Sequence, residues 1–92
     1  MNTESVDCRK VKGFDEMEKP GDFYFASREG HEGILIILPG DLWTHLKIQK
    51  GQQGGHRVWG WDGNIEKPTL IPSILCDNKW HGFLTNGRLI SC

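Results

Sequence analysis

The stretch LCDNKWHGF, residues 75–83, gathers several side chains that can do chemistry within nine positions. It contains Cys76, Asp77, Trp80 and His81. A cysteine thiolate and a histidine imidazole can bind a metal, and a cysteine or serine beside a histidine can act as a nucleophile. Three kinds of site are therefore open: a metal site, a cysteine nucleophile and a serine nucleophile.

A metal site would use Cys76, His81 and Cys92 as its ligands. A structural zinc normally takes four ligands, often from Cys-x-x-Cys pairs, and the sequence contains no such pair. A fourth ligand would have to be recruited from elsewhere, for example His56. The simpler interpretation is a small buried thiol beside a hydrogen-bonded histidine, so we expect neither a metal nor a cofactor.

The two nucleophile hypotheses share His81 as the base. Cys76 would need His81 close enough to hold its thiolate in an ion pair, but it follows two apolar residues, which favours a buried and inert thiol. Ser73 closes the segment PTLIPS (68–73), and its hydroxyl is a weak nucleophile until a neighbouring base takes the proton. Serine and histidine are common in β domains, so the residues alone leave both hypotheses open.

Length and composition predict one small globular domain over residues 1–92, because so short a chain closes only one modest core. The net charge is −1, from 11 basic and 12 acidic residues with no basic stripe, which disfavours nucleic acid as a partner.

The longest apolar run, Ile34–Leu38, is too short to span a bilayer. The polar first ten residues lack the apolar stretch of a signal peptide. We therefore expect a cytoplasmic protein with free thiols and no membrane contact.

The spacing of apolar and turn residues predicts an all-β fold, an antiparallel sheet closed into a small barrel or sandwich. Residues 14–21 can hold at most one helical turn, and residues 51–55 read as a flexible loop. The segment 66–73 carries two prolines and is expected at a sheet edge or a surface crossing. The apolar segment 33–38 is expected to be a central strand covered on both faces. Further strands are expected at 6–10, 22–27, 42–48 and 56–64.

The C-terminal segment HGFLTNGRLISC predicts a β-hairpin, because Asn86-Gly87 is the preferred pair for a two-residue type I′ turn. That turn sets Thr85 opposite Arg88, and His81 opposite Cys92 with Cβ atoms about 4.5–5.5 Å apart. One face of the hairpin then carries His81, Phe83, Thr85, Arg88, Ile90 and Cys92.

Five blocks, read in order, resemble a family of small phage and bacterial proteins, domain of unknown function 6527. They are PGDFYF, ILPGDLW, HRVWGWDGN, KPTLIPSI and WHGFLTNGRL, and the resemblance runs from residue 20 to the end of the chain. Members of that family occur in bacterial operons that encode ubiquitin-like proteins with E1-like and E2-like enzymes. There the domain is regarded as a serine peptidase that trims or releases the C-terminus of the ubiquitin-like protein.

The resemblance implies that Ser73 is the nucleophile and His81 the general base. Relatives often have Cys-His-Ser-Phe where this chain has Trp80-His81-Gly82-Phe83, so the histidine is shared and the neighbouring cysteine is not. Asp62, in the Asp-Gly-Asn turn, is the candidate third member. The implied partners are the C-terminal tail of a ubiquitin-like protein and the E1-like and E2-like enzymes.

Two tryptophans, Trp61 and Trp80, are candidate substrate-binding side chains that would narrow a channel for a glycine-rich tail. Two other functions stay open beside the peptidase. One is a protein-binding module without catalysis, such as a phage or defence-related inhibitor, since exposed aromatic residues on a small rigid sheet suit binding as well. The other is a zinc-stabilised structural domain.

The register between the strands before and after residues 77–79 separates these hypotheses. If Leu75 lies opposite His81, Ser73 and His81 form a diagonal pair on one face, with Cα atoms about 7–8 Å apart. If Cys76 lies opposite His81 instead, Ser73 moves to the other face. A slip of one residue thus distinguishes a serine site from a cysteine or metal site.

Overall fold

The computed structural model describes residues 5–51 and 57–92, and its regular structure consists of β-strands and one 3-10 turn, η1. Within these residues no helix is long and apolar enough to cross a membrane. The elements are β1 (Ser5–Asp7), β2 (Arg9–Lys10), η1 (Phe14–Glu16), β3 (Asp22–Phe25), β4 (Gly33–Leu38), β5 (Leu42–Lys50), β6 (Trp59–Trp61), β7 (Leu70–Cys76), β8 (Trp80–Thr85) and β9 (Arg88–Ser91).

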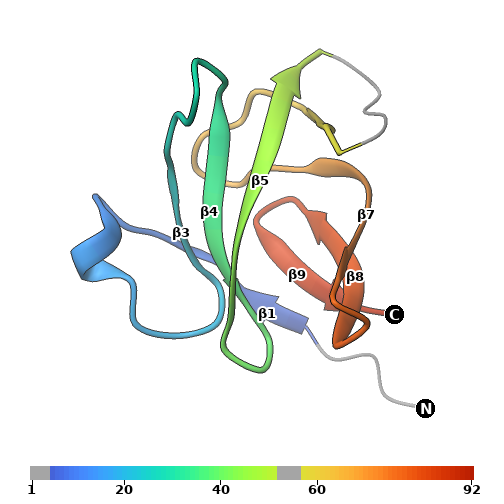
Figure 1. Ribbon diagram of the computed structural model, residues 1–92. Helices are drawn as coiled ribbons and strands as arrows, with labels where there is room; N and C mark the ends of the chain where they lie inside the picture. The colour runs from blue at the N-terminus through green and yellow to red at the C-terminus, as the bar shows by residue number, and fades with distance from the viewer. Residues whose placement is uncertain (1–4, 52–56) are drawn as a thin grey trace.

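The strands form one sheet in the order β1-β9-β8-β7-β6-β5-β4-β3-β2, which curls round on itself (Figure 1). Its two end strands, β1 and β2, are consecutive in the sequence and are separated by a single residue, Cys8. The amide of Cys8 donates to the carbonyl of Gly87, and the amide of Arg9 donates to the carbonyl of Gly21. This short segment therefore joins both ends of the sheet. The predicted all-β class is confirmed, and of the two predicted forms, barrel or sandwich, the sheet takes the barrel, although the pairs β2–β3 and β5–β6 are parallel where an antiparallel sheet was expected.

The core lies inside the barrel, because each strand turns alternate side chains inward. In β8 the inward residues Trp80, Gly82 and Leu84 are buried, and the residues that alternate with them, His81, Phe83 and Thr85, are exposed. The other core residues come from both halves of the sheet: Phe23, Ile34, Ile36, Leu38, Leu46, Ile48, Trp61, Leu70, Ile74 and Leu89.

A smaller apolar cluster covers the outer face of β4. Val11 and Met17, on either side of η1, pack with Ile37 into a second buried cluster. The prediction of a central strand at 33–38, covered on both faces, is therefore confirmed. The single helical turn expected within 14–21 is present as η1.

Two sequence-based expectations were wrong in detail. The strand expected at 6–10 is divided into two, because β1 pairs antiparallel with β9 while β2 pairs parallel with β3. The segment 66–73 was expected at an edge, but its last four residues belong to β7, which pairs with β6 and β8. The β7–β8 ladder skips the residues between Leu70 and Ile74, so Pro72 lies where its missing N–H costs no ladder bond.

Three other strand expectations differ only at their ends: β3 stops at Phe25, β5 extends to Lys50, and β6 is shorter than 56–64. Of the predicted loop 51–55, residues 52–55 lie outside the described residues, as does His56.

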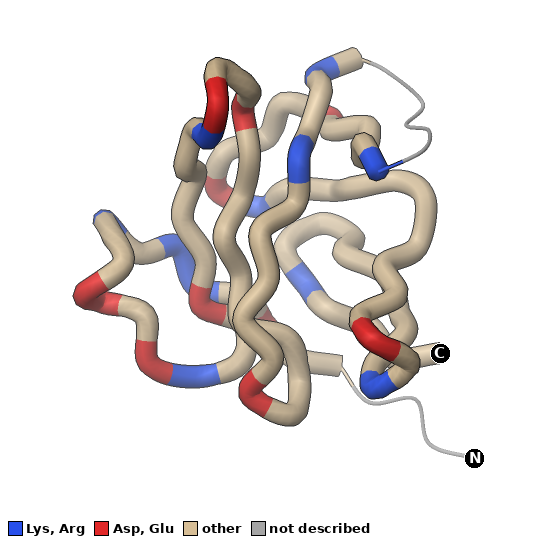
Figure 2. Tube along the Cα trace, in the orientation of Figure 1, with Lys and Arg blue, Asp and Glu red and all other residues tan. Residues whose placement is uncertain are grey.

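One fully buried carboxylate, that of Asp22, fixes the seam of the barrel. It accepts two hydrogen bonds from the Arg9 guanidinium, at 3.0 and 2.7 Å, and further bonds from the amides of Glu18 and Lys19. Burial alone would raise the pKa of Asp22, but these donors outweigh it and hold the pKa below its ordinary value of 3.8. Elsewhere in the described residues basic and acidic side chains are interspersed, apart from an acidic stretch around η1 (Figure 2).

Replacing Asp22 with Asn should lower the free energy of unfolding by about 2 kcal/mol, because the buried side chain loses its charge-assisted hydrogen bonds, while the Arg9 side chain left behind is half-exposed to water. Urea denaturation at neutral pH measures this change. Glu18→Gln is the matched control: Glu18 also contacts Arg9, but its side chain is 72% exposed. The control should change stability by no more than about 1 kcal/mol, and an equal loss in both variants would contradict the assignment.

The same carboxylate predicts an acid-sensitive component of stability. Since its pKa is lower in the folded state than the ordinary value of 3.8, its contribution is complete above that value and declines as the pH falls below it. The stability difference between the wild type and Asp22→Asn should therefore shrink between about pH 5 and about pH 2. Paired urea titrations across that range measure it, and a difference independent of pH would contradict the prediction.

Candidate active site

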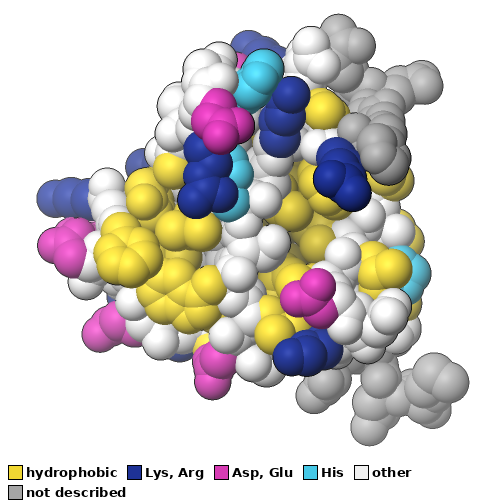
Figure 3. All heavy atoms as spheres, in the orientation of Figure 1, with side chains coloured by type: hydrophobic (Ala, Val, Ile, Leu, Met, Phe, Trp, Pro, Cys, Tyr) yellow, Lys and Arg dark blue, Asp and Glu magenta, His cyan; other side chains and the backbone are white. Residues whose placement is uncertain are grey.

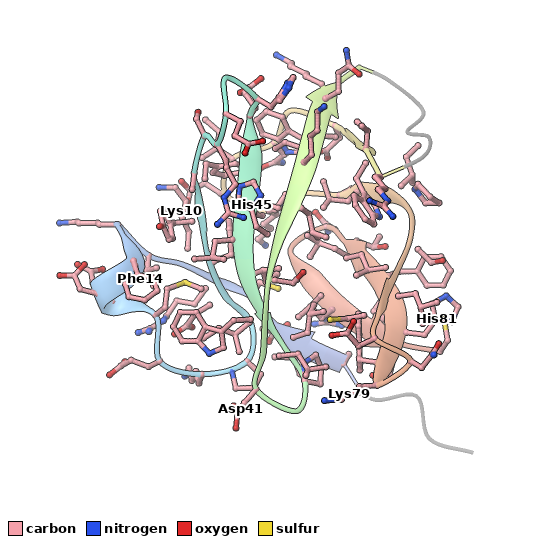
Figure 4. All side chains as sticks on the ribbon, in the orientation of Figure 1. Lys10, Phe14, Asp41, His45, Lys79 and His81 are labelled. Atoms are coloured by element: carbon pink, nitrogen blue, oxygen red, sulfur yellow. The ribbon has the colours of Figure 1, made fainter. Side chains whose placement is uncertain are left out.

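Ser73 and His81 lie on the neighbouring strands β7 and β8 and are hydrogen-bonded to each other. Their side chains approach to 2.9 Å, from Ser73 Oγ to His81 Nε2. Leu75 is the residue directly opposite His81, which is the register that places the two on one face as a diagonal pair. His81 lies at one side of the molecule and its side chain points away from the barrel (Figure 4).

An irregularity in β7 sets the position of Ser73. The ladder runs from the Leu70–Leu84 pair directly to the Ile74–Gly82 pair, so three residues of β7 face one residue of β8. The indole of Trp59 donates to the carbonyl oxygen of Ser73 at 3.2 Å. A bulge changes the direction of the side chains within it. The hydrogen bond from Trp59 connects the last residue of the bulge, Ser73, to β6.

A tight turn fixes the register between the two strands. Asp77 and Asn78 both have positive φ, at 49° and 57°, a conformation that Asn and Asp tolerate better than most residues. The amide of Lys79 donates to the carbonyl of Cys76 at 2.8 Å. Because the turn contains only residues 77–79, Cys76 pairs with Trp80, and Leu75 with His81.

The cysteines are not brought together with His81 as a set. Cys76 packs against the core cluster, whereas Leu75 and His81 are exposed on the other side of the sheet. The amide of Cys92 donates to the carbonyl of His81, so Cys92 alone neighbours the histidine. No group of three or more His, Cys, Asp and Glu residues suited to a metal occurs within 5–51 and 57–92. Burial also raises the pKa of the Cys8 thiol to about 12.

Asp62 lies at the far end of β7 from His81. Its Oδ1 accepts hydrogen bonds from the amides of Asn64 and Thr69, at 3.0 and 3.2 Å. Thr69 precedes β7, and it lies six positions before Leu75, the partner of His81. The structure therefore places Asp62 in the turn before β7 and does not bring it to the Ser73–His81 pair.

Trp61 and Trp80 are both more than nine-tenths buried in the core, and each indole N–H is already bonded within the chain. Trp61 donates to the carbonyl of Asn64, and Trp80 donates to Ser91 Oγ. The ring of Trp80 lies against Gly82, where a Cβ atom would collide with it. This contact explains why a large residue at position 80 accompanies a glycine at position 82.

The outward face around the pair is apolar. Leu75, Ile71 and Phe83 are 60%, 47% and 44% exposed. The sequence placed Phe83 on the face of His81, and it placed Leu75 there in one of the two possible registers. It gave no role to Ile71 or Trp59, because the register between β7 and β8 was open.

The arrangement is suited to activating the serine hydroxyl. A neutral imidazole that accepts the hydroxyl hydrogen bond can take the proton as oxygen attacks a carbonyl. Both groups lie on the surface, where a substrate can reach them: His81 is exposed and Ser73 half-buried.

Trp59→Phe should disturb this site without unfolding the protein. The variant keeps most of the aromatic surface but loses the hydrogen bond to the Ser73 carbonyl, so the free energy of unfolding should fall by about 1 kcal/mol. Urea denaturation gives that value. In NMR spectra the amide signals of residues 72–74 should shift, whereas Trp43→Phe, on the exposed aromatic pair with Phe14, should leave them unchanged. Unchanged amide signals of residues 72–74 in Trp59→Phe would contradict the role of the Trp59–Ser73 hydrogen bond in positioning this segment.

Comparison with known families gives one match, and it covers most of the chain. The model of the bacterial ubiquitination-like system serine protease family, BubE, matches residues 9–92. Neither the curated proteins nor the solved structures contain a significant match. The chain therefore belongs to the family of serine proteases of bacterial ubiquitination-like systems.

Proposed function

We propose that this protein is a serine peptidase that processes or deconjugates the C-terminus of a bacterial ubiquitin-like protein by acyl transfer through Ser73 and His81. The observation that carries the proposal is the 2.9 Å hydrogen bond between Ser73 Oγ and His81 Nε2 on an exposed face. Membership of a family described as serine proteases of ubiquitination-like systems supports it.

In the proposed reaction Ser73 Oγ attacks the carbonyl carbon of the terminal glycine of the tail, while His81 Nε2 takes the hydroxyl proton. The tetrahedral intermediate collapses to an acyl-enzyme as His81 returns the proton to the leaving amine. A water molecule then attacks the ester, His81 takes a proton from it, and Ser73 is regenerated with the free tail carboxylate.

Backbone N–H groups near the turn at 77–80 would stabilise the oxyanion, although the amide of Lys79 is already committed to Cys76. We assign Asp62 no part in proton transfer, since its Oδ1 accepts backbone amides at the other end of β7. Trp61 and Trp80 support the site from within the core instead of forming a channel wall. E1-like and E2-like enzymes are the expected partners in the same system.

A fluorophosphonate probe tests the nucleophile directly. The wild type should gain one adduct at Ser73, and Ser73→Ala should lose it together with cleavage of a ubiquitin-like precursor. His81→Gln should slow labelling by about 10²–10⁴-fold, the usual contribution of a general base. Circular dichroism checks that each variant is folded.

Ser27→Ala is the matched control, because Ser27 is exposed and outside the site. It should label at the wild-type rate. A folded wild-type protein that is never labelled, and a precursor that Ser73→Ala still cleaves, would each contradict the proposal. Absence of labelling with retained binding to a protein partner would favour the non-catalytic binding module.

A further inference from the structure

Three exposed apolar side chains surround the Ser73–His81 pair, and the proposed proton transfer uses none of them. Leu75, Ile71 and Phe83 are each exposed by 44% or more. A single exposed apolar residue on a small domain needs no explanation. These three, however, belong to the two strands that hold the reacting groups.

The reacting pair lies between two of these side chains. Leu75 is directly opposite His81 across the ladder. Phe83 lies opposite the bulge that contains Ser73, because the residues on either side of Phe83 pair across the irregularity. The four outward side chains thus form a quadrilateral, with the Ser73–His81 hydrogen bond on one diagonal and Leu75 and Phe83 at the other two corners.

Charged side chains are absent from the two strands that form this face, and on the neighbouring β9 the Arg88 side chain, opposite Thr85, is paired with Asp7. Strands β7 and β8, with the sequences LIPSILC and WHGFLT, contain no Lys, Arg, Asp or Glu. The nearest charged residues along the chain between them are Asp77 and Lys79, in the turn. In Figure 3 hydrophobic side chains border the histidine at the right-hand edge of the molecule. A charged segment lying here would lose water without gaining an ion pair, whereas an apolar one would be stabilised.

We propose that this face, defined by Ile71, Leu75 and Phe83, binds an extended segment of the substrate in which the residues on either side of the glycine at the scissile bond carry bulky apolar side chains. The inference rests on the proposed function, because only a substrate that places a carbonyl at Ser73 Oγ must cover its neighbours. Two residues of an extended chain span about 6.6–6.8 Å. Ser73 and Leu75, two positions apart on β7, are separated by the same distance. When the carbonyl lies at Ser73 Oγ, the apolar side chains on either side of it therefore contact Leu75 and Phe83.

A second exposed apolar surface lies on another part of the barrel and provides a control. Phe14 and Trp43 form an aromatic pair with ring centroids 5.4 Å apart, and together with Arg28 and His45 they line a hollow of about 430 Å³. Phe14 and His81 are at opposite sides of the molecule in Figure 4. Trp43 is 45% exposed, almost the same as Phe83, so their replacement by serine removes comparable apolar surface.

The test compares three fluorophosphonates: one with a small ethyl group, one carrying a dileucyl peptide and one carrying a diglutamyl peptide. In each case Ser73 Oγ bonds to phosphorus, fluoride leaves and the hydroxyl proton passes to His81. Intact-mass spectrometry gives the second-order rate constants. The wild type should react with the dileucyl probe on the order of tenfold faster than with the diglutamyl probe.

The variants Leu75→Ser and Phe83→Ser should each slow the dileucyl reaction by on the order of tenfold. Each peptide rate is divided by the rate of the same variant with the ethyl probe, so that a general change in the reactivity of Ser73 cancels. Trp43→Ser should leave all three rates unchanged. The apolar face is not the binding surface if the ethyl probe labels Ser73 but the dileucyl and diglutamyl probes react at the same rate. The same conclusion follows if Leu75→Ser and Phe83→Ser leave the preference for the dileucyl probe unchanged. If no probe labels Ser73, the proposed function itself is overturned.

Discussion

The barrel depends on an ion pair between the buried carboxylate of Asp22 and the half-exposed guanidinium of Arg9, at the seam where the two ends of the sheet meet. Arg9 and Asp22 face each other across β2 and β3, and the carboxylate of Asp22 also holds the amides of Glu18 and Lys19. Just before Arg9, β1 pairs with β9. A buried carboxylate with four donors is stable in one geometry only, since each missing donor would leave a charge without compensation. The seam therefore fixes where both ends of the sheet meet.

From that seam the sheet continues strand by strand to the candidate site. β1 pairs with β9, β9 with β8, and β8 with β7, so the two strands that carry Ser73 and His81 lie well inside the sheet. On one side β8 is paired with β9 by a regular ladder, and on the other it is paired with β7 on both sides of the bulge. A slip of β7 by one residue would turn Ile74 out of the core and bring Leu75 in. Burial of the apolar face thus holds the reacting pair together, and the hydrogen bond between them is a consequence of the register.

The inner and outer faces of β8 have different tasks. Inside, the indole of Trp80 covers Gly82 and donates to Ser91, so the core is filled without any group that takes part in chemistry. Outside, His81 and Phe83 are exposed. Because side chains alternate along β8, the residues that pack the core and the residues that face a substrate lie on opposite sides of the same strand.

The sequence by itself determined the all-β class, the central strand at 33–38 and the pairing across Asn86-Gly87, because these features depend on local preferences: apolar periodicity and turn chemistry. It also marked Ser73 and His81 as a candidate pair, but it left open whether the register between their strands would bring them together. Their contact depends on a three-residue turn and on the bulge at 71–73, and no local pattern specifies either. The division of 6–10 into two strands, the burial of Trp61 and Trp80, and the distance of Asp62 from His81 were likewise decided by the tertiary structure. Closing a sheet into a barrel assigns each residue a face and a neighbour that sequence separation does not encode.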